Sequence, residues 1–259
     1  MPHKNLLLDR LPREVYDRIS PDLEKVVMTQ GQILHRKGET IKELYFPLTC
    51  MISITIMMKD GRTVETGAIG SREVVGINAF MGGRETTDTE YIVQLPGDAM
   101  VIAAAQLKIE FNRNTEMRQL MLKYTQALMA QISQNVGCNR LHEDGRRFAR
   151  WLLEVRDRVE ADEFPLTQKF MGEMLGVRRE AVTNAARKLK REGVIDYSRG
   201  HIQILDLPRL QAASCECYKV LKDEYDRLLG TRGRRRSSRR VRESAPIVVG
   251  HQAKVTSRR

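Results

Sequence analysis

The spacing of apolar residues divides the chain into a helical start, a strand-rich middle and a helical second half. Residues 1–30 repeat apolar side chains at helical spacing, with Pro12 and Pro21 at expected helix starts. Across residues 31–107, short runs of β-branched and apolar residues alternate with glycine-containing turns, and Asp60-Gly61 between two of these runs favours a hairpin. This pattern predicts an antiparallel β-roll or barrel in an α+β protein.

Residues 111–137 return to helical periodicity, with no glycine or proline before Gly137. At about 1.5 Å per residue, such a helix would reach roughly 40 Å. A helix of that length with one apolar seam often pairs with a copy of itself, so we expect a homodimer and a break at Gly137. The alternative is that the seam packs on the barrel of its own chain. The predicted dimer residues are Met117, Leu120, Met121, Tyr124, Leu128 and Ile132.

The most informative functional pattern lies within residues 167–190. Thr167 suits a helix N-cap, and Gly176 would end a first short helix in a left-handed turn. Two helices that cross closely need a small residue in the first helix, here Gly172. They also need an apolar residue in the second helix that packs between them, here Val182. This spacing predicts a helix-turn-helix.

The outward face of the second helix has the chemistry of a DNA-reading surface. Positions 178–191 hold six basic residues and one acid. Arginine can donate two hydrogen bonds to the edge of a guanine, and glutamate can accept a hydrogen bond from the amino group of a cytosine. The alternative is a basic helix whose charges only face solvent. Two β runs flanking Ser198-Arg199-Gly200 then predict a wing that touches phosphates. The predicted DNA-binding residues are Thr167, Gln168, Arg178, Arg179, Glu180, Thr183, Asn184, Arg187, Lys188, Ser198, Arg199 and His201.

This order of elements resembles the Crp/Fnr superfamily of bacterial transcription regulators, most specifically from Leu166 to Leu205. The resemblance implies a cyclic-nucleotide-binding-like β-roll, a long dimerisation helix and a C-terminal winged helix-turn-helix. It also implies a homodimer on inverted-repeat double-stranded DNA, with RNA polymerase as a further partner. Arg179 and Glu180 match the family's adjacent Arg-Glu, whereas Asn184 stands where the family commonly has Arg, so the half-site sequence should differ.

The β-roll departs from the family's phosphate-binding pattern for cyclic nucleotides. Gly76 fits that pattern, but Ile77 replaces the family's Glu, and Thr87 or Thr89 falls near its Arg position. The nearest arginine, Arg84, comes about two residues early. A buried cyclic phosphate without arginine lacks a charge partner, so we expect no response to cyclic AMP and leave the effector unknown.

Charge is distributed unevenly between the body of the chain and its end. The net charge is +11, and residues 230–259 hold ten basic residues and one acid. We expect this tail to be disordered and to assist DNA binding without sequence preference.

The expected domains are a β-roll at 1–110, a dimerisation helix at 111–137, the winged helix-turn-helix at 138–210, a C-terminal helix at 211–229 and the tail at 230–259. With no signal-like or membrane-length apolar segment, we expect a cytoplasmic protein.

The cysteines and histidines suggest neither a metal site nor an enzyme. Cys50, Cys138, Cys215 and Cys217 contain no CxxC pair, and Cys50 and Cys138 are far from the other two in sequence. We therefore expect reduced thiols, no metal and no cofactor. His35 is the single histidine of the strand region, and no catalytic arrangement is recognisable, so no catalytic residue is predicted. The alternative function is a redox or small-molecule sensor whose primary site is Cys215/Cys217 or the β-roll pocket.

Overall fold

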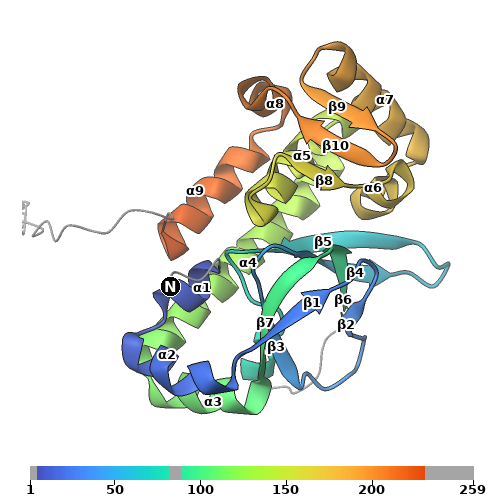
Figure 1. Ribbon diagram of the computed structural model, residues 1–259. Helices are drawn as coiled ribbons and strands as arrows, with labels where there is room; N and C mark the ends of the chain where they lie inside the picture. Colours follow the sequence, from blue (N-terminus) through green and yellow to red (C-terminus); the bar gives the residue numbers. More distant parts are fainter. Residues whose placement is uncertain (1–4, 82–88, 231–259) are drawn as a thin grey trace, which may run out of the picture.

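The first module is a β-roll built from two antiparallel sheets (Figure 1). The computed structural model describes residues 5–81 and 89–230. One sheet has the order β1 (Glu24–Met28), β7 (Gly97–Ala103), β3 (Glu43–Pro47). The other has the order β2 (Ile33–His35), β6 (Glu90–Leu95), β4 (Met51–Met57), β5 (Thr63–Ile69). Alternating apolar residues such as Leu44, Phe46, Ile52 and Val93 are fully buried between the sheets, which confirms the predicted roll.

Short helices surround one end of the roll, and one long helix follows them. The short ones are α1 (Leu6–Arg10), α2 (Arg13–Ile19), η1 (Ser20–Asp22), η2 (Ile77–Phe80) and α3 (Ala104–Arg113). Residues 24–28 were expected to be helical but form β1, because pairing along β7 outweighs their local preference. None of the described helices combines the length and apolar character that crossing a membrane requires.

The long helix is α4 (Thr115–Leu141), shifted from the expected 111–137. It starts after Asn114, whose side chain accepts a hydrogen bond from the Met117 amide at 2.8 Å. The predicted break at Gly137 is wrong, because the helix continues through this residue to Leu141. A single glycine inside a helix costs only about 1 kcal/mol relative to alanine, which the packing of α4 outweighs.

The seam that we expected to form a dimer faces the α4 helix's own β-roll. Met117, Met121 and Tyr124 are fully buried in the core of the same chain, and Leu128 is 7% exposed. The Tyr124 hydroxyl also donates to the Val74 carbonyl at 2.8 Å. These four residues are therefore not free to pair with a second copy. Leu120 and Ile132 are partly buried against the same core. Periodicity shows that one helix face is buried but not what covers it.

The second module has its own core and a small sheet of order β8-β10-β9. Its elements are α5 (Asp144–Val159), β8 (Glu163–Pro165), α6 (Gln168–Leu175), α7 (Arg179–Arg191), β9 (Ile195–Ser198) and β10 (His201–Ile204). The helix expected over 211–229 is in fact two, α8 (Leu207–Ala213) and α9 (Cys217–Leu229). Helix α9 turns back from the second module and packs along α4 (Figure 1).

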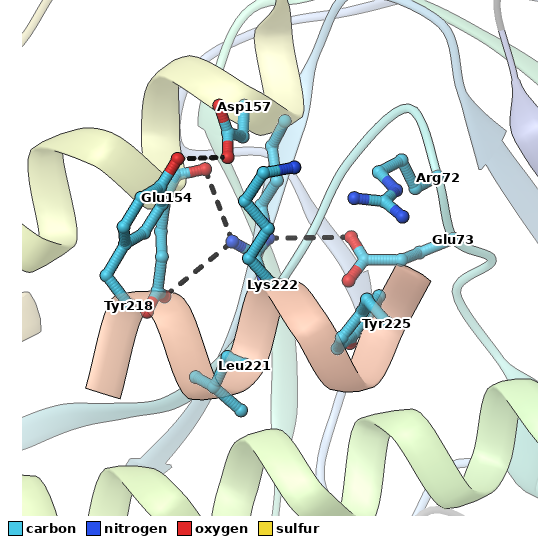
Figure 2. A pocket seen from close by; sticks show the side chains of 9 residues that line it. Arg72, Glu73, Glu154, Asp157, Tyr218, Leu221, Lys222 and Tyr225 are labelled. Atoms are coloured by element: carbon cyan, nitrogen blue, oxygen red, sulfur yellow. Dashed lines mark hydrogen bonds and ion pairs between the residues drawn. The ribbon is translucent and has the colours of Figure 1, made fainter. Parts of the chain in front are cut away.

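Buried charges join the two modules. Arg158 of α5 donates to the Ala68 carbonyl at 3.0 Å and lies 3.5 Å from the Glu73 carboxylate, both in the first module. Arg158, Glu73 and Glu154 line a small cavity of about 40 Å³ between α5 and α9 (Figure 2). Arg150 adds a 2.9 Å hydrogen bond to Asn135 of α4. Because each of these charges is paired, α5 is held firmly against the roll and α4.

Candidate nucleic-acid interface

Two glycines allow α6 and α7 to meet in a sharp turn. Gly176 ends α6 with a φ of +64°, in the left-handed region that favours glycine. A Cβ placed on Gly172 would lie 3.1 Å from the Val177 carbonyl oxygen, so the small residue permits the close crossing. At the start of α6, the Thr167 hydroxyl accepts from the Phe170 amide at 3.3 Å. Val182 is 1% exposed in the shared core. The predicted helix-turn-helix is confirmed.

The start of α7 presents polar side chains to solvent. Arg179, Glu180 and Asn184 are all exposed, and Arg178 is exposed at the N-cap position. Further along the helix, Arg187 and Lys188 are exposed as well. These side chains include donors and acceptors of the kind that read base edges, and Arg178, Arg179 and Glu180 lie at the helix end whose free amide groups favour phosphate.

Two predicted DNA-binding residues, Gln168 and Thr183, are partly buried and contact each other. The Thr183 hydroxyl lies 2.9 Å from the Gln168 side-chain oxygen and 3.0 Å from the Arg179 carbonyl. This contact ties the first turn of α6 to α7. The contact helps to set the angle between the two helices and thereby the position of the exposed side chains at the start of α7.

The wing is a tight hairpin of β9 and β10, in which Ser198 pairs with His201. Its two turn residues, Arg199 and Gly200, have φ values of +48° and +80°, as a type I′ turn requires. Ser198, Arg199 and His201 are exposed, so the tip carries one cation and two hydrogen-bonding groups. The Leu166 amide donates to the Gly200 carbonyl at 2.7 Å, which fixes the wing beside the start of α6.

The hairpin that joins β4 and β5 lies against the helix-turn-helix, a contact that the sequence did not reveal. A cleft of about 1140 Å³ separates them, lined by Arg62 and Val64 on one side and by Arg178 and Arg179 on the other. A Cβ on Gly176 would lie 3.1 Å from Val64. The sequence gives no signal for this contact, because the two segments are more than a hundred residues apart and neither is apolar enough to indicate an interface.

The β-roll positions singled out for a cyclic nucleotide are only partly described. Gly76 begins η2 with a φ of +93°, and Ile77 is 3% exposed in the apolar core. Arg84 and Thr87 lie outside the described residues, as do residues 231–259 of the basic tail. Thr89 is described and is partly buried just before β6.

Comparison with known proteins agrees with this architecture. Residues 146–213 match the family model of the Crp-like helix-turn-helix domain. That range contains α6, α7 and the wing. No curated protein matches the chain.

Solved structures similar to the chain include regulators described as members of the Crp/Fnr or CRP family. FixK2 from Bradyrhizobium japonicum has a TM-score of 0.65 at 15% identity, over 74% of this chain and 98% of its own. A Crp/Fnr-family regulator from Eubacterium rectale has a TM-score of 0.61 at 20% identity, over 80% and 96%. A CRP-family regulator from Thermus thermophilus has a TM-score of 0.61 at 17% identity, over 73% and 96%. Residues 146–213 thus match a Crp-like helix-turn-helix domain, and the chain shares the overall fold of these solved regulators.

Proposed function

We propose that the protein acts as a homodimer that reads an inverted-repeat DNA site and that it does not respond to cyclic AMP. The observation that carries the proposal is the exposed Arg179-Glu180 pair, with Asn184, at the start of the second helix of a helix-turn-helix. In this motif the second helix enters the major groove and its first residues contact base edges.

Each exposed group has a distinct role in this proposal. Arg179 donates two hydrogen bonds to a guanine, Glu180 accepts a hydrogen bond from a cytosine amino group, and Asn184 forms hydrogen bonds with an adenine. Phosphate contacts come from the remaining cations and wing residues and orient the helix without reading sequence. These are Arg178, Arg187, Lys188, Ser198, Arg199 and His201. A bound dimer would regulate transcription by contacting RNA polymerase or by blocking it.

The proposed dimer forms through the face of α4 that the β-roll leaves uncovered. Leu122, Met129 and Val136 are 55%, 64% and 68% exposed, although they are large and apolar. They recur every seven residues, which is the spacing of a coiled-coil seam. A two-fold pair of α4 helices would present two recognition helices to half-sites about one helical turn apart.

The proposed insensitivity to cyclic AMP rests on Ile77. Its apolar side chain fills the core at the position after Gly76, where cyclic-nucleotide-binding relatives carry an acid. A buried isoleucine offers no hydrogen bond to a ribose or a phosphate. Equal DNA affinity with and without cyclic AMP is the expected result.

Selection of bound duplexes from a random pool tests the proposal. We expect the wild-type protein to enrich a palindromic sequence. Arg179→Ala and Glu180→Ala should each cost about 1–3 kcal/mol at one base pair of the half-site and relax preference there. Arg13→Ala is the matched control, because this side chain is 90% exposed on α2, far along the chain from the recognition helix.

Two outcomes would count against the proposal. Enrichment of no sequence by the wild type would remove specific recognition. A uniform loss of affinity in Arg179→Ala, with the preference kept, would show that this arginine contacts phosphate only.

Deletion of residues 230–259 should lower affinity for all sequences and reduce the salt dependence, while the palindromic preference survives.

A further inference from the structure

The fold brings together four soft donor groups that lie far apart in sequence. Cys138 is in the last turn of α4, and His142 directly follows that helix. Cys217 is the first residue of α9, and Cys215 precedes that helix by two residues. One donor atom from each residue lies within 4.8 Å of all the others. The three cysteines are at most 2% exposed, and the His142 side chain is 20% exposed, so the cluster is buried with one histidine edge near solvent.

Two distances within the cluster are those expected between neighbouring ligands of a single tetrahedral metal ion, and all donor atoms lie within 4.8 Å of one another. The sulfurs of Cys138 and Cys215 are 3.6 Å apart, and the Cys217 sulfur is 3.5 Å from Nδ1 of His142. Zinc bonds of about 2.3 Å to sulfur and about 2.0–2.1 Å to nitrogen place neighbouring ligands of a tetrahedron about 3.5–3.8 Å apart. A four-iron cluster needs a wider cage, because each of its ligand sulfurs binds a different iron. A disulfide would require the two sulfurs to approach to about 2.05 Å.

Outer groups hold the ligands in a metal-binding orientation. Nε2 of His142 lies 3.1 Å from a carboxylate oxygen of Glu216. A proton on Nε2 shared with Glu216 leaves the lone pair of Nδ1 directed at the cluster, which is the carboxylate–histidine–metal arrangement of zinc proteins. The side-chain amide of Gln134 lies 3.1 Å from the Cys217 sulfur and donates to it. Such a hydrogen bond favours the thiolate form that binds metal.

We propose that Cys138, His142, Cys215 and Cys217 bind one zinc ion through three thiolates and one imidazole. Zinc replaces the thiol protons of the three cysteines, which are released to solvent, and histidine binds as the neutral ring. The ion would fasten the end of α4 to the start of α9. It would do so at the two-residue link His142-Glu143, which connects α4 to α5 and hence to the DNA-binding module. The site is independent of the proposed DNA specificity.

Metal analysis of the full chain, purified with a thiol reductant, tests the site. We expect one zinc per chain. Replacement by cobalt should give the intense visible absorption of a tetrahedral ion with thiolate ligands. Cys138→Ser, Cys215→Ser and Cys217→Ser should each lose at least nine-tenths of the bound metal. Cys50→Ala is the matched control, because Cys50 is the fourth cysteine, is fully buried, and lies in the core of the β-roll.

Three further variants separate metal binding from a loss of folding, which circular dichroism would monitor. His142→Cys should retain zinc through four thiolate ligands, whereas His142→Ala should bind it more weakly. Glu216→Gln should lower zinc affinity about tenfold, because it weakens the partner of His142 without removing a ligand. Unchanged affinity in both His142→Ala and Glu216→Gln would overturn the assignment of these two roles.

Three results would overturn the site itself. The first is a reduced, folded wild-type chain that takes up neither zinc nor cobalt. The second is iron recovered with acid-labile sulfide, which would show an iron–sulfur cluster. The third is a Cys138–Cys215 disulfide in the protein as purified under reductant, found by mass spectrometry of peptides. A normal zinc content with no specific DNA binding would leave the zinc site standing and remove the proposed function alone.

Discussion

At the scale of single residues, backbone conformation decides what an added side chain would do at two glycines, Gly176 in the turn of the helix-turn-helix and Gly137 inside α4. Gly176 has a left-handed φ of +64° at the turn, whereas Gly137 is an ordinary helical residue of α4 with open space where a Cβ would stand. The same substitution should therefore have opposite effects at these positions. At position 176 a side chain would be strained in the folded protein. At position 137 it would fit the helix and would stabilise the protein by reducing the conformational freedom of the unfolded chain.

We expect Gly176→Ala to destabilise the protein by about 1–2 kcal/mol, because alanine is strained in the left-handed region. Its Cβ would also lie 3.1 Å from Val64. Gly137→Ala should stabilise the protein by about 0.5–1 kcal/mol, as glycine is a poor helix former. Chemical denaturation of both variants and the wild type measures this. Equal destabilisation of the two would contradict the conformational argument.

At the scale of elements, α4 has two apolar faces with different tasks. Met117, Met121 and Tyr124 face the β-roll of the same chain. The second face, with Met129 at its centre, is exposed among the described residues. The sequence made the first face conspicuous because its residues are more numerous and closely spaced. The second face was recognisable only after the first had been assigned to the core.

Met129→Glu should convert the proposed dimer to a monomer, because two like charges would then face each other across a two-fold seam. Affinity for an inverted-repeat duplex should fall more than tenfold, since a monomer engages one half-site. Ile109→Glu on α3 is the control, because Ile109 is also apolar and 57% exposed. Light scattering after gel filtration gives the oligomeric state. A Met129→Glu variant that stays dimeric would move the interface away from this face.

At the scale of the whole molecule, Glu65 links the two modules from a buried position. Its carboxyl accepts from the Trp151 indole of α5 at 3.0 Å and lies 2.6 Å from the Ser53 hydroxyl. Burial raises the pKa of Glu65 to about 7, against the opposing effects of the two hydrogen bonds and of Arg158. The charge of Glu154 raises the pKa further. The contact between modules therefore contains a group that titrates near neutral pH.

Glu65 should make the protein less stable as pH rises from about 4.5 to above 7. The pKa is higher in the folded chain than in the unfolded chain, so the neutral acid stabilises the fold at low pH, and this contribution is lost on ionisation. A difference of about 2.5 pH units corresponds to about 3 kcal/mol. Glu65→Gln keeps the acceptor for Trp151 and cannot ionise. Denaturation at pH 5 and pH 8 should show a fall in wild-type stability that this variant lacks, and parallel profiles would contradict the assignment.

Local patterns were sufficient for much of the fold and for the helix-turn-helix of the candidate site. Runs of β-branched and apolar residues on either side of Asp60-Gly61 located β4 (Met51–Met57) and β5 (Thr63–Ile69), and the glycine spacing located the turn of the helix-turn-helix. The exposed residues Arg179, Glu180 and Asn184 could be placed on one face because they lie within six positions of one another on one helix. The strand β1 was misassigned because its neighbour β7 is some seventy residues away and supplies the pairing.

The sequence by itself determined the helix-turn-helix and its exposed Arg179-Glu180 pair, because backbone freedom, side-chain volume and helical spacing act over a few residues. Only the tertiary structure decided which face of α4 is free. It also decided which distant residues meet: Glu65 with Trp151, and Cys138 with Cys215. The physical reason is that packing and donor geometry depend on distances in space, and separation along the chain does not fix those distances.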